Sequence, residues 1–316
     1  MKLSIVLPPE VRELDRALSL IEEAERLGFH SAMLGCGHHM DPLIVFALAR
    51  ERTERLLLTT NIMPTFTRHP LVMAMQASTT QAALAGRLRL GLGPGHASVI
   101  EGSFGLSFER LIRHTTEYFH VLRDIFESGA SNFQGEMYRV DWQVDVEAPE
   151  IPLLLASLGV QMCRTAGRHA DGVLPWLAPP RYVRDTIIPE LRSSAAAAGR
   201  PTPPVVMIMP CILSTDRDQV RAGVHGYLDL YPRLEAYAAL LQRCGVPDAE
   251  RALEDGWTDP MIDAVVPHGD QAALTTTMRA YEEAGVAEMA FLPVGVGADP
   301  QASVERSWQL LAELHE

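Results

Sequence analysis

The chain has 316 residues, of which 47% are hydrophobic and 21% charged, proportions typical of a folded globular protein and not of a disordered one. Forty acidic side chains against 27 Lys and Arg give a net charge of −13, which argues against electrostatic binding to nucleic acid or to an anionic membrane surface. No apolar run approaches the ~18 residues of a membrane span.

Four scattered cysteines form no Cys-x-x-Cys pair, so the sequence indicates neither a disulfide framework nor a zinc ribbon. The N-terminal segment has no basic region or cleavage site of a secretory signal. We therefore expect a soluble cytoplasmic protein.

Short apolar runs alternate with segments of helical period along most of the chain. The eight strand–helix units predict an α/β fold, a (β/α)8 barrel, although periodicity also allows an open doubly wound sheet. The predicted strands are 3–7, 31–34, 56–62, 87–92, 153–156, 172–175, 205–213 and 289–294. The predicted helices are 13–27, 42–50, 70–85, 108–126, 160–168, 180–198, 216–229, 233–244, 271–284 and 300–314.

Two segments interrupt this alternation. Polar and apolar residues alternate about a glycine turn at 131–147, which predicts a small hairpin outside the barrel. Residues 214–270, before the last strand, are mostly of helical character. We expect one domain over residues 1–316, with these two segments as insertions.

The functional groups of a (β/α)8 barrel lie at the C-terminal ends of its strands. The predicted strand ends carry mainly Gly, Ser, Asn and His instead of carboxylates, which suits a large flat cofactor held by backbone contacts. These positions are Pro8-Pro9, Cys36 to His39, Asn61 to Pro64, Pro94 to His96, Ser157 to Gly159, Trp176, Ser214 and Gly295 to Gly297.

The glycine-rich segment Gly91 to Gly95 resembles a dinucleotide fingerprint only superficially. The third glycine of that motif falls on His96, Pro94 stiffens the loop, and we expect no helix to begin there. The glycines serve either a sharp turn or the close approach of a ligand to the backbone. The loop Ser157 to Val160 precedes a predicted helix, so it is either a phosphate site or an ordinary connection.

The histidines at the strand ends are candidates for proton transfer. His38 and His39 are adjacent and face different sides, and no HxH or HExxH spacing occurs, so we expect no metal site. One of them, or His96, is a candidate proton donor because imidazole titrates near neutrality. No Gly-x-Ser-x-Gly elbow is present to support a hydrolase.

Several segments together resemble the luciferase-like monooxygenase superfamily, and most closely its oxidoreductases that depend on the deazaflavin coenzyme F420. The resemblance extends over essentially the whole chain. The segments that carry it are Leu57 to Pro64, Arg68 to Pro70, Ala74 to Thr79, Ala85 to Gly93, Ala166 to Pro175 and Arg192 to Arg200.

This resemblance implies a barrel that binds F420, or alternatively FMN, at its strand ends and that forms a homodimer. Members of the family often carry a non-prolyl cis peptide behind the cofactor ring, and that bond aligns here with Asn61–Ile62. The family's phosphate site aligns with Ser157 to Val160. The cofactor-binding residues implied are Thr60, Asn61, Ile62, Gly93, His96, Ser157, Leu158, Gly159 and Val160.

The sequence departs from the family at the second strand, where the family's Asp-His pair aligns with Cys36 and Gly37. A slip of one residue puts His38 in the role, so His38 and His96 are the catalytic candidates. Lys2 is the only lysine, which argues against the sugar phosphates that some members oxidise.

We expect hydride transfer between the deazaflavin C5 and a small organic substrate. A pocket lined by Phe66, Trp176 and Leu177 would make that substrate partly apolar. The alternatives are an FMN-dependent monooxygenase and a non-catalytic binding protein on the same barrel.

Overall fold

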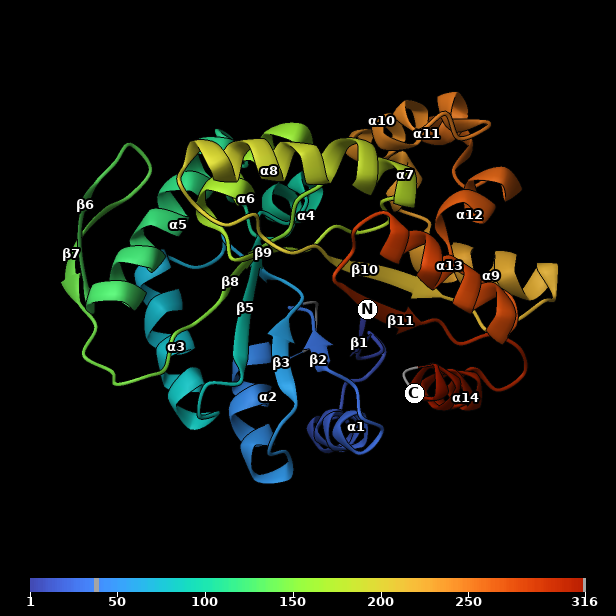
Figure 1. Ribbon diagram of the computed structural model, residues 1–316, viewed down its shortest axis with the longest axis horizontal. Coiled ribbons are helices and arrows are strands. Elements are labelled where there is room, and N and C mark those ends of the chain that lie inside the picture. Colours follow the sequence, from blue (N-terminus) through green and yellow to red (C-terminus); the bar gives the residue numbers. More distant parts are fainter. Residues whose placement is uncertain (37–39, 315–316) are drawn as a thin grey trace.

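The computed structural model describes residues 1–36 and 40–314 (Figure 1). The main sheet has the order β10-β11-β1-β2-β3-β5-β8-β9, and all neighbouring strands are parallel. Its strands are β1 (Lys2–Val6), β2 (Ser31–Leu34), β3 (Leu57–Thr60), β5 (Leu88–Gly93), β8 (Leu153–Leu155), β9 (Gly172–Val173), β10 (Val206–Cys211) and β11 (Glu288–Pro293).

The ends of this sheet meet, because backbone bridges join Val173 to Val205 and Trp176 to Ile208 beside β9 and β10. The sheet therefore closes into a barrel, as predicted, and the open doubly wound alternative is wrong. The helices that surround it are α1 (Leu14–Arg26), α2 (Pro42–Ala49), α3 (Pro70–Ala83), α5 (Leu111–Ser128), α6 (Val160–His169), α8 (Ile188–Ala197), α13 (Gln271–Glu283) and α14 (Pro300–Glu313).

Aspartate caps explain where several helices begin. The carboxylate of Asp41 accepts the backbone N–H of Leu43, and Pro42 occupies the first turn of α2. Asp270 and Asp299 cap α13 and α14 in the same way. The predicted helix at 180–198 is divided into α7 (Pro180–Tyr182), a π-helical turn η2 (Val183–Ile187) and α8.

One helix was not expected. The loop after β5 contains α4 (Ala97–Gly102), so the prediction that no helix begins there is wrong. The sequence contains little indication of this helix, because His96 makes no side-chain cap and Ile100 is the one buried residue of the six in the helix. The barrel topology nevertheless excludes a Rossmann fold.

Both predicted insertions contain the expected kinds of element. Strands β6 (Ala130–Gln134) and β7 (Arg139–Gln143) form an antiparallel hairpin, whose turn is held because Glu117 accepts the backbone N–H groups of Glu136, Met137 and Tyr138. The late insertion is helical. It contains α9 (Arg217–Leu228), the short 3-10 turns η3 (Tyr231–Arg233) and η4 (Ala249–Arg251), α10 (Glu235–Arg243), α11 (Ala252–Asp255) and α12 (Asp259–Val265).

The barrel interior is apolar toward the strand ends and polar toward its floor. The apolar cluster consists of Val6, Met33, Leu154, Leu174, Val206, Ile208, Ala290 and Leu292. At the floor, both Arg89 terminal nitrogens donate to the buried Glu288 carboxylate at 2.7 Å, and the Ser4 hydroxyl donates to it at 2.6 Å. Burial acts to raise the pKa of Glu288, but Arg89 holds that pKa below its ordinary value.

We expect Arg89→Leu to lower the free energy of unfolding by about 3–5 kcal/mol, because it leaves a buried carboxylate without its arginine partner. The double variant Arg89→Leu/Glu288→Leu should recover most of this loss, since it removes both charges. Urea unfolding followed by circular dichroism measures both effects. A loss below about 1 kcal/mol in the single variant would show that the pair behaves like an exposed ion pair.

A second polar group joins the hairpin to the barrel through the buried His114 on α5. Its Nε2 lies 2.9 Å from the Thr65 hydroxyl and its Nδ1 lies 3.1 Å from the Tyr138 hydroxyl. The imidazole also stacks on Phe66, with 3.6 Å between ring centroids. Burial lowers the pKa of His114 to about 4, so the ring is neutral near pH 7.

This lowered pKa has a consequence for acid stability. The unfolded chain takes up a proton at His114 near pH 6.5, whereas the folded protein resists protonation until about pH 4. The contribution of His114 to the free energy of unfolding is therefore fully present above pH 6.5. It is lost between pH 6.5 and 4, by an amount on the order of 3 kcal/mol. Thermal unfolding of His114→Gln should show a smaller fall over this range than the parent, whereas the exposed His225→Gln control should fall as the parent does.

Candidate functional site

The backbone makes a bulge where β3 reaches the end of the barrel. The peptide bond Asn61–Ile62 is cis, as predicted. Strand β3 pairs Leu58 with Leu88, whereas β4 (Met63–Pro64) pairs Met63 with Leu92, so the segment between them holds one residue more than the facing part of β5. On its other side, the bulge is held because Asn61 N donates to Leu34 O at 2.8 Å.

The glycines at the end of β5 are explained by this bulge. A side chain at Gly91 would overlap the carbonyl oxygen of Thr60, and a Cβ at Gly93 would lie 2.7 Å from Ile62 Cδ1 and 2.9 Å from Ala156 Cβ. The Thr60 hydroxyl donates to Gly91 O at 2.7 Å. The two glycines thus permit close packing of the bulge on β5, a third explanation beside the turn and the ligand contact.

The bulge and the predicted phosphate loop lie on either side of one strand. In the sheet order β5 stands between β3 and β8, and a Cβ at Gly93 in β5 would meet both Ile62 of the bulge and Ala156, which precedes the loop. The two features therefore lie close together at the end of β5. Ile62 packs against the apolar cluster inside the barrel. This end of the barrel therefore has a kinked backbone on one side and a loop that leads into a helix on the other.

That loop ends in an uncapped helix N-terminus. Gly159 is the N-cap of α6 and provides no side-chain hydrogen bond to the first amides. A Cβ on Gly159 would meet nothing within 4 Å, so there is open space beside it. The buried Ser157 hydroxyl is directed to the carbonyls of Leu155 and Met162, at 3.3 and 3.4 Å. Backbone amides, and not this hydroxyl, are therefore the groups suited to an anion.

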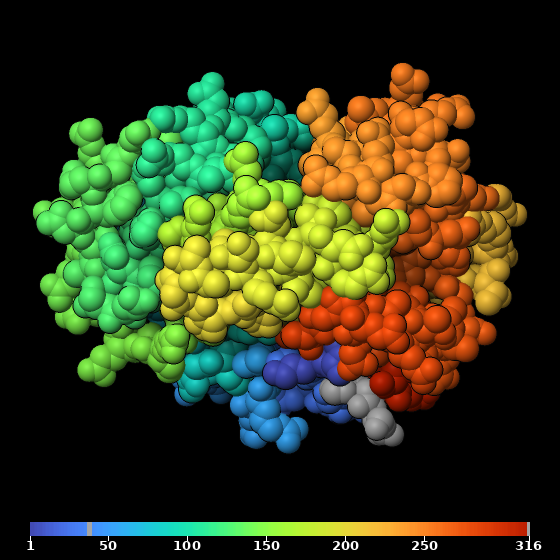
Figure 2. All heavy atoms as spheres, turned by 45° about the horizontal axis from the view of Figure 1, so that its top comes forward, coloured from blue at the N-terminus to red at the C-terminus, as the bar shows by residue number. Residues whose placement is uncertain are grey.

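Of the two candidate proton donors, only His96 is among the described residues. His38, with its neighbours at 37 and 39, lies outside them. His96 is half-buried at the start of α4, burial lowers its pKa, and its ring lies 6.1 Å from that of Tyr231 in an edge-on arrangement. Figure 2 shows a hollow between the teal segment near residue 100 and the orange segment that carries α10 and α11.

The end of β2 holds an ion pair that the sequence analysis did not foresee. Arg68 donates to Asp41, the residue that also caps α2. The thiol of Cys36 lies near both groups, and burial raises the pKa of this thiol despite the opposing charge of Arg68. At the position aligned with the family's aspartate, Cys36 is thus a neutral thiol.

Only one of the three residues predicted to line a substrate pocket lies at the barrel mouth. Trp176 packs against the apolar cluster at the barrel mouth. Phe66 instead lies against His114 and Phe108, and Leu177 is buried in the core. Tyr227 packs against the same apolar cluster as Trp176 and was missed, although Tyr227 and Tyr231 are one helical turn apart in the sequence.

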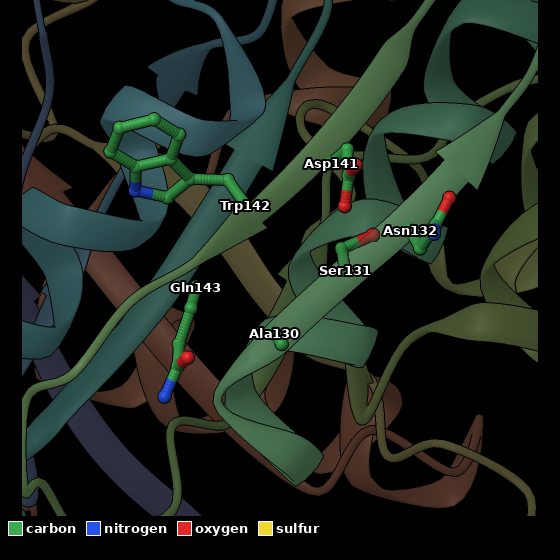
Figure 3. Close-up of a pocket in the computed structure, with 6 residues that line it drawn as sticks. All are labelled: Ala130, Ser131, Asn132, Asp141, Trp142 and Gln143. Atoms are coloured by element: carbon green, nitrogen blue, oxygen red, sulfur yellow. The ribbon is translucent and has the colours of Figure 1, made fainter.

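A separate surface pocket lies on the hairpin, away from the strand ends (Figure 3). It crosses β6 and β7 and includes Trp142, whose side chain is 57% exposed.

Among residues 1–36 and 40–314, no three His, Cys, Asp or Glu side chains are grouped as metal ligands. Within the same residues, no helix is long and apolar enough to cross a membrane.

Comparison with known proteins gives a family match and several curated relatives. The family model for luciferase-like monooxygenases matches residues 1–288. A relative in Nakamurella multipartita, named as an F420-dependent glucose-6-phosphate dehydrogenase, is 32% identical over 195 residues, which are 59% of this chain and 57% of that relative. The chain thus matches little more than half the length of this curated relative. A protein of Mycobacterium tuberculosis without an assigned function is 28% identical over 75% of this chain and 74% of its own length.

Solved structures share the fold over nearly the whole chain. An F420-dependent secondary alcohol dehydrogenase, in complex with an F420-acetone adduct, has a TM-score of 0.81 at 17% identity, with 99% of this chain and 97% of that chain covered. The oxygenating component of a diketocamphane monooxygenase from Pseudomonas putida, in complex with FMN, has a TM-score of 0.76 at 16% identity, with the same coverage. The match to residues 1–288 shows that this chain belongs to the luciferase-like monooxygenase family.

Proposed function

We propose that the protein is an oxidoreductase that uses coenzyme F420 and exchanges a hydride with a small, partly apolar organic substrate. The observation that carries the proposal is the backbone bulge at Asn61–Ile62, packed on the bare glycines of β5, with an uncapped helix N-terminus on the other side of that strand. A flat ring against the bulge and a phosphate at the helix would use both features. The relatives named as F420-dependent support the choice of cofactor. The deazaflavin, when bound, supplies a carbon that donates or accepts a hydride.

The chain's own residues would bind and orient that cofactor. Thr60, Asn61 and Ile62 would support the ring from behind, with Gly93 allowing the bulge to pack. The amides of the loop from Ser157 through Leu158 and Gly159 to Val160 would hold the phosphate, since a helix N-terminus attracts anions. His96, whose pKa is lowered by burial, is neutral near pH 7 and would exchange a proton with substrate. His38 is the second proposed catalytic residue.

FMN is the second candidate cofactor, and a structural neighbour in complex with FMN supports it. Reduced FMN at the same place would make the protein a monooxygenase that activates oxygen. A non-catalytic binding protein is the third candidate, because Cys36 and Gly37 align with the family's Asp-His pair. Fluorescence titration of the protein with oxidised F420 and with FMN separates these candidates, and we expect tighter binding of F420.

A negative charge introduced at position 159 tests the proposed phosphate site. Gly159→Asp should weaken F420 binding at least tenfold, because its carboxylate would repel a phosphate at the same amides. The same aspartate caps α6 and favours the helix, so the melting temperature should not fall. Gly159→Asn is the matched control, since it provides a cap without the charge and should bind F420 nearly as the parent does.

Equal affinity of the aspartate and asparagine variants would place the phosphate elsewhere. Weak binding by both variants would point to the size of the side chain and not to its charge. Only a loss confined to Gly159→Asp supports an anion at this helix.

We also propose that the chain functions as a cytoplasmic homodimer of single-domain barrels, joined through α2 and α3. The sequence of α2 is apolar on all sides, which is unusual for a helix that faces water. On the adjoining faces of the two helices, Ile44 is 60% exposed, Leu48 46%, Val72 40% and Met75 39%. A second copy that presents the same face would cover them.

Ile44→Glu/Leu48→Glu should convert this dimer to monomer, because a charge would be buried on each side of the interface. Sedimentation velocity measures the change. Leu253→Glu, on the exposed side of α11, is the control and should leave the dimer intact. A parent protein that sediments as a monomer would rule out this interface.

A further inference from the structure

Three rings from distant parts of the sequence meet at the barrel mouth. Tyr231, in the late insertion, lies 6.1 Å from His96, which follows β5, and 5.6 Å from Trp176, which follows β9. Tyr237 backs Tyr231 at 5.1 Å. We refer to His96, Trp176 and Tyr231 as the mouth cluster.

The mouth cluster stands directly over the barrel interior. Trp176 is fixed by a backbone bridge to Ile208, and it borders the same interior apolar cluster as Ile62 of the cis bulge. The bulge and Trp176 thus border the same part of the barrel interior, and Tyr231 lies next to Trp176.

The late insertion holds Tyr231 firmly. Trp257 Nε1 donates to Leu228 O at 2.8 Å, and Arg233 donates to Glu254 O at 3.0 Å. Arg221 and Arg217 both pair with Asp259, which joins α9 to α12. These hydrogen bonds and ion pairs fix the segment that carries Tyr231 at the mouth of the barrel.

The mouth cluster carries an indole N–H beside a phenol O–H. Trp176 Nε1 is buried, has no hydrogen-bond partner of standard length and angle among the described residues, and is close enough to the Tyr231 hydroxyl to lower the pKa of that phenol. Burial raises the pKa of Tyr231 to about 12, with Trp176 acting in the opposite direction, so the phenol keeps its proton near pH 7. An indole N–H and a phenol O–H inside an aromatic wall favour a ligand that has an acceptor oxygen on an apolar body.

Two arginines near this end of the barrel are engaged with other groups. Arg68 pairs with Asp41, and Arg233 is bound to Glu254 O and lies 3.9 Å from Asp229. Lys2, the only lysine of the chain, begins β1 at the opposite end of the barrel. A phosphate ester bound against the mouth cluster would lose its hydration without gaining Arg68, Arg233 or Lys2 as a partner, which is unfavourable.

We propose that the mouth cluster binds an uncharged ring compound with a ketone or alcohol oxygen, which Tyr231 orients by a hydrogen bond from its hydroxyl. Trp176 offers its ring face to the ring of the compound, while its buried N–H stays beside the Tyr231 hydroxyl. This inference rests on the proposed function for the reaction, but the binding surface is the chain's own. It distinguishes this protein from the relatives named for glucose 6-phosphate.

Acetophenone is a suitable probe because it has one aromatic ring and one ketone oxygen. Calorimetric titration of the protein, with and without oxidised F420, should give a dissociation constant below about 1 mM, within the range for a ligand of nine heavy atoms. Tyr231→Phe should weaken binding about tenfold in both states. Tyr237→Phe, which removes a hydroxyl behind the mouth cluster, is the matched control and should change binding less than twofold.

Glucose 6-phosphate should show no binding under the same conditions. Binding of glucose 6-phosphate at least as tight as that of acetophenone, no acetophenone binding by the parent, or equal affinity of Tyr231→Phe and the parent would each overturn the inference. F420 affinity, measured separately by fluorescence, should be the same in Tyr231→Phe and the parent. Absence of F420 binding by the parent would refute the proposed function, while the acetophenone series without cofactor would still decide the inference.

Discussion

The candidate site depends on one packing constraint, the close approach of the Asn61–Ile62 bulge to the end of β5. The extra residue of the bulge fits only because Gly91 and Gly93 carry no side chain where Thr60 and Ile62 come near. Ala156 closes the far side of Gly93, so three consecutive strands share one tight row of contacts. Backbone geometry, and not a set of charged side chains, therefore shapes the surface on which a flat cofactor would lie.

The architecture could be predicted from the sequence because its signals are local and repeated. Alternation of apolar runs with helical periods, and aspartates at helix starts such as Asp41, act within a few residues. The short helix α4 escaped prediction because His96 supplies no cap and a single residue, Ile100, is buried. The position of the cis bond was predicted from the resemblance alone, since Asn61 and Ile62 have no intrinsic preference for it.

The side chains at the mouth were harder to predict, because they meet only after the barrel closes. Phe66, Trp176 and Leu177 were expected together, yet the structure sends Phe66 to His114 and Leu177 into the core. Tyr231 reaches Trp176 from a segment 55 residues later, and no periodicity records such a contact. Gly91 and Gly93 at the end of β5 are likewise required by residues on the neighbouring strand, a contact that a single sequence does not reveal.

The closure of the barrel also bears on how the chain folds. Strand β1 pairs with β2 on one side and with β11 on the other, with Lys2 opposite Glu288. During synthesis, the outer edge of β1 has no partner until nearly the whole chain has left the ribosome. Loop closure of this length is slow, and unpaired strand edges promote aggregation. The N-terminal half of the barrel therefore keeps an unpaired strand edge until β11 has been made.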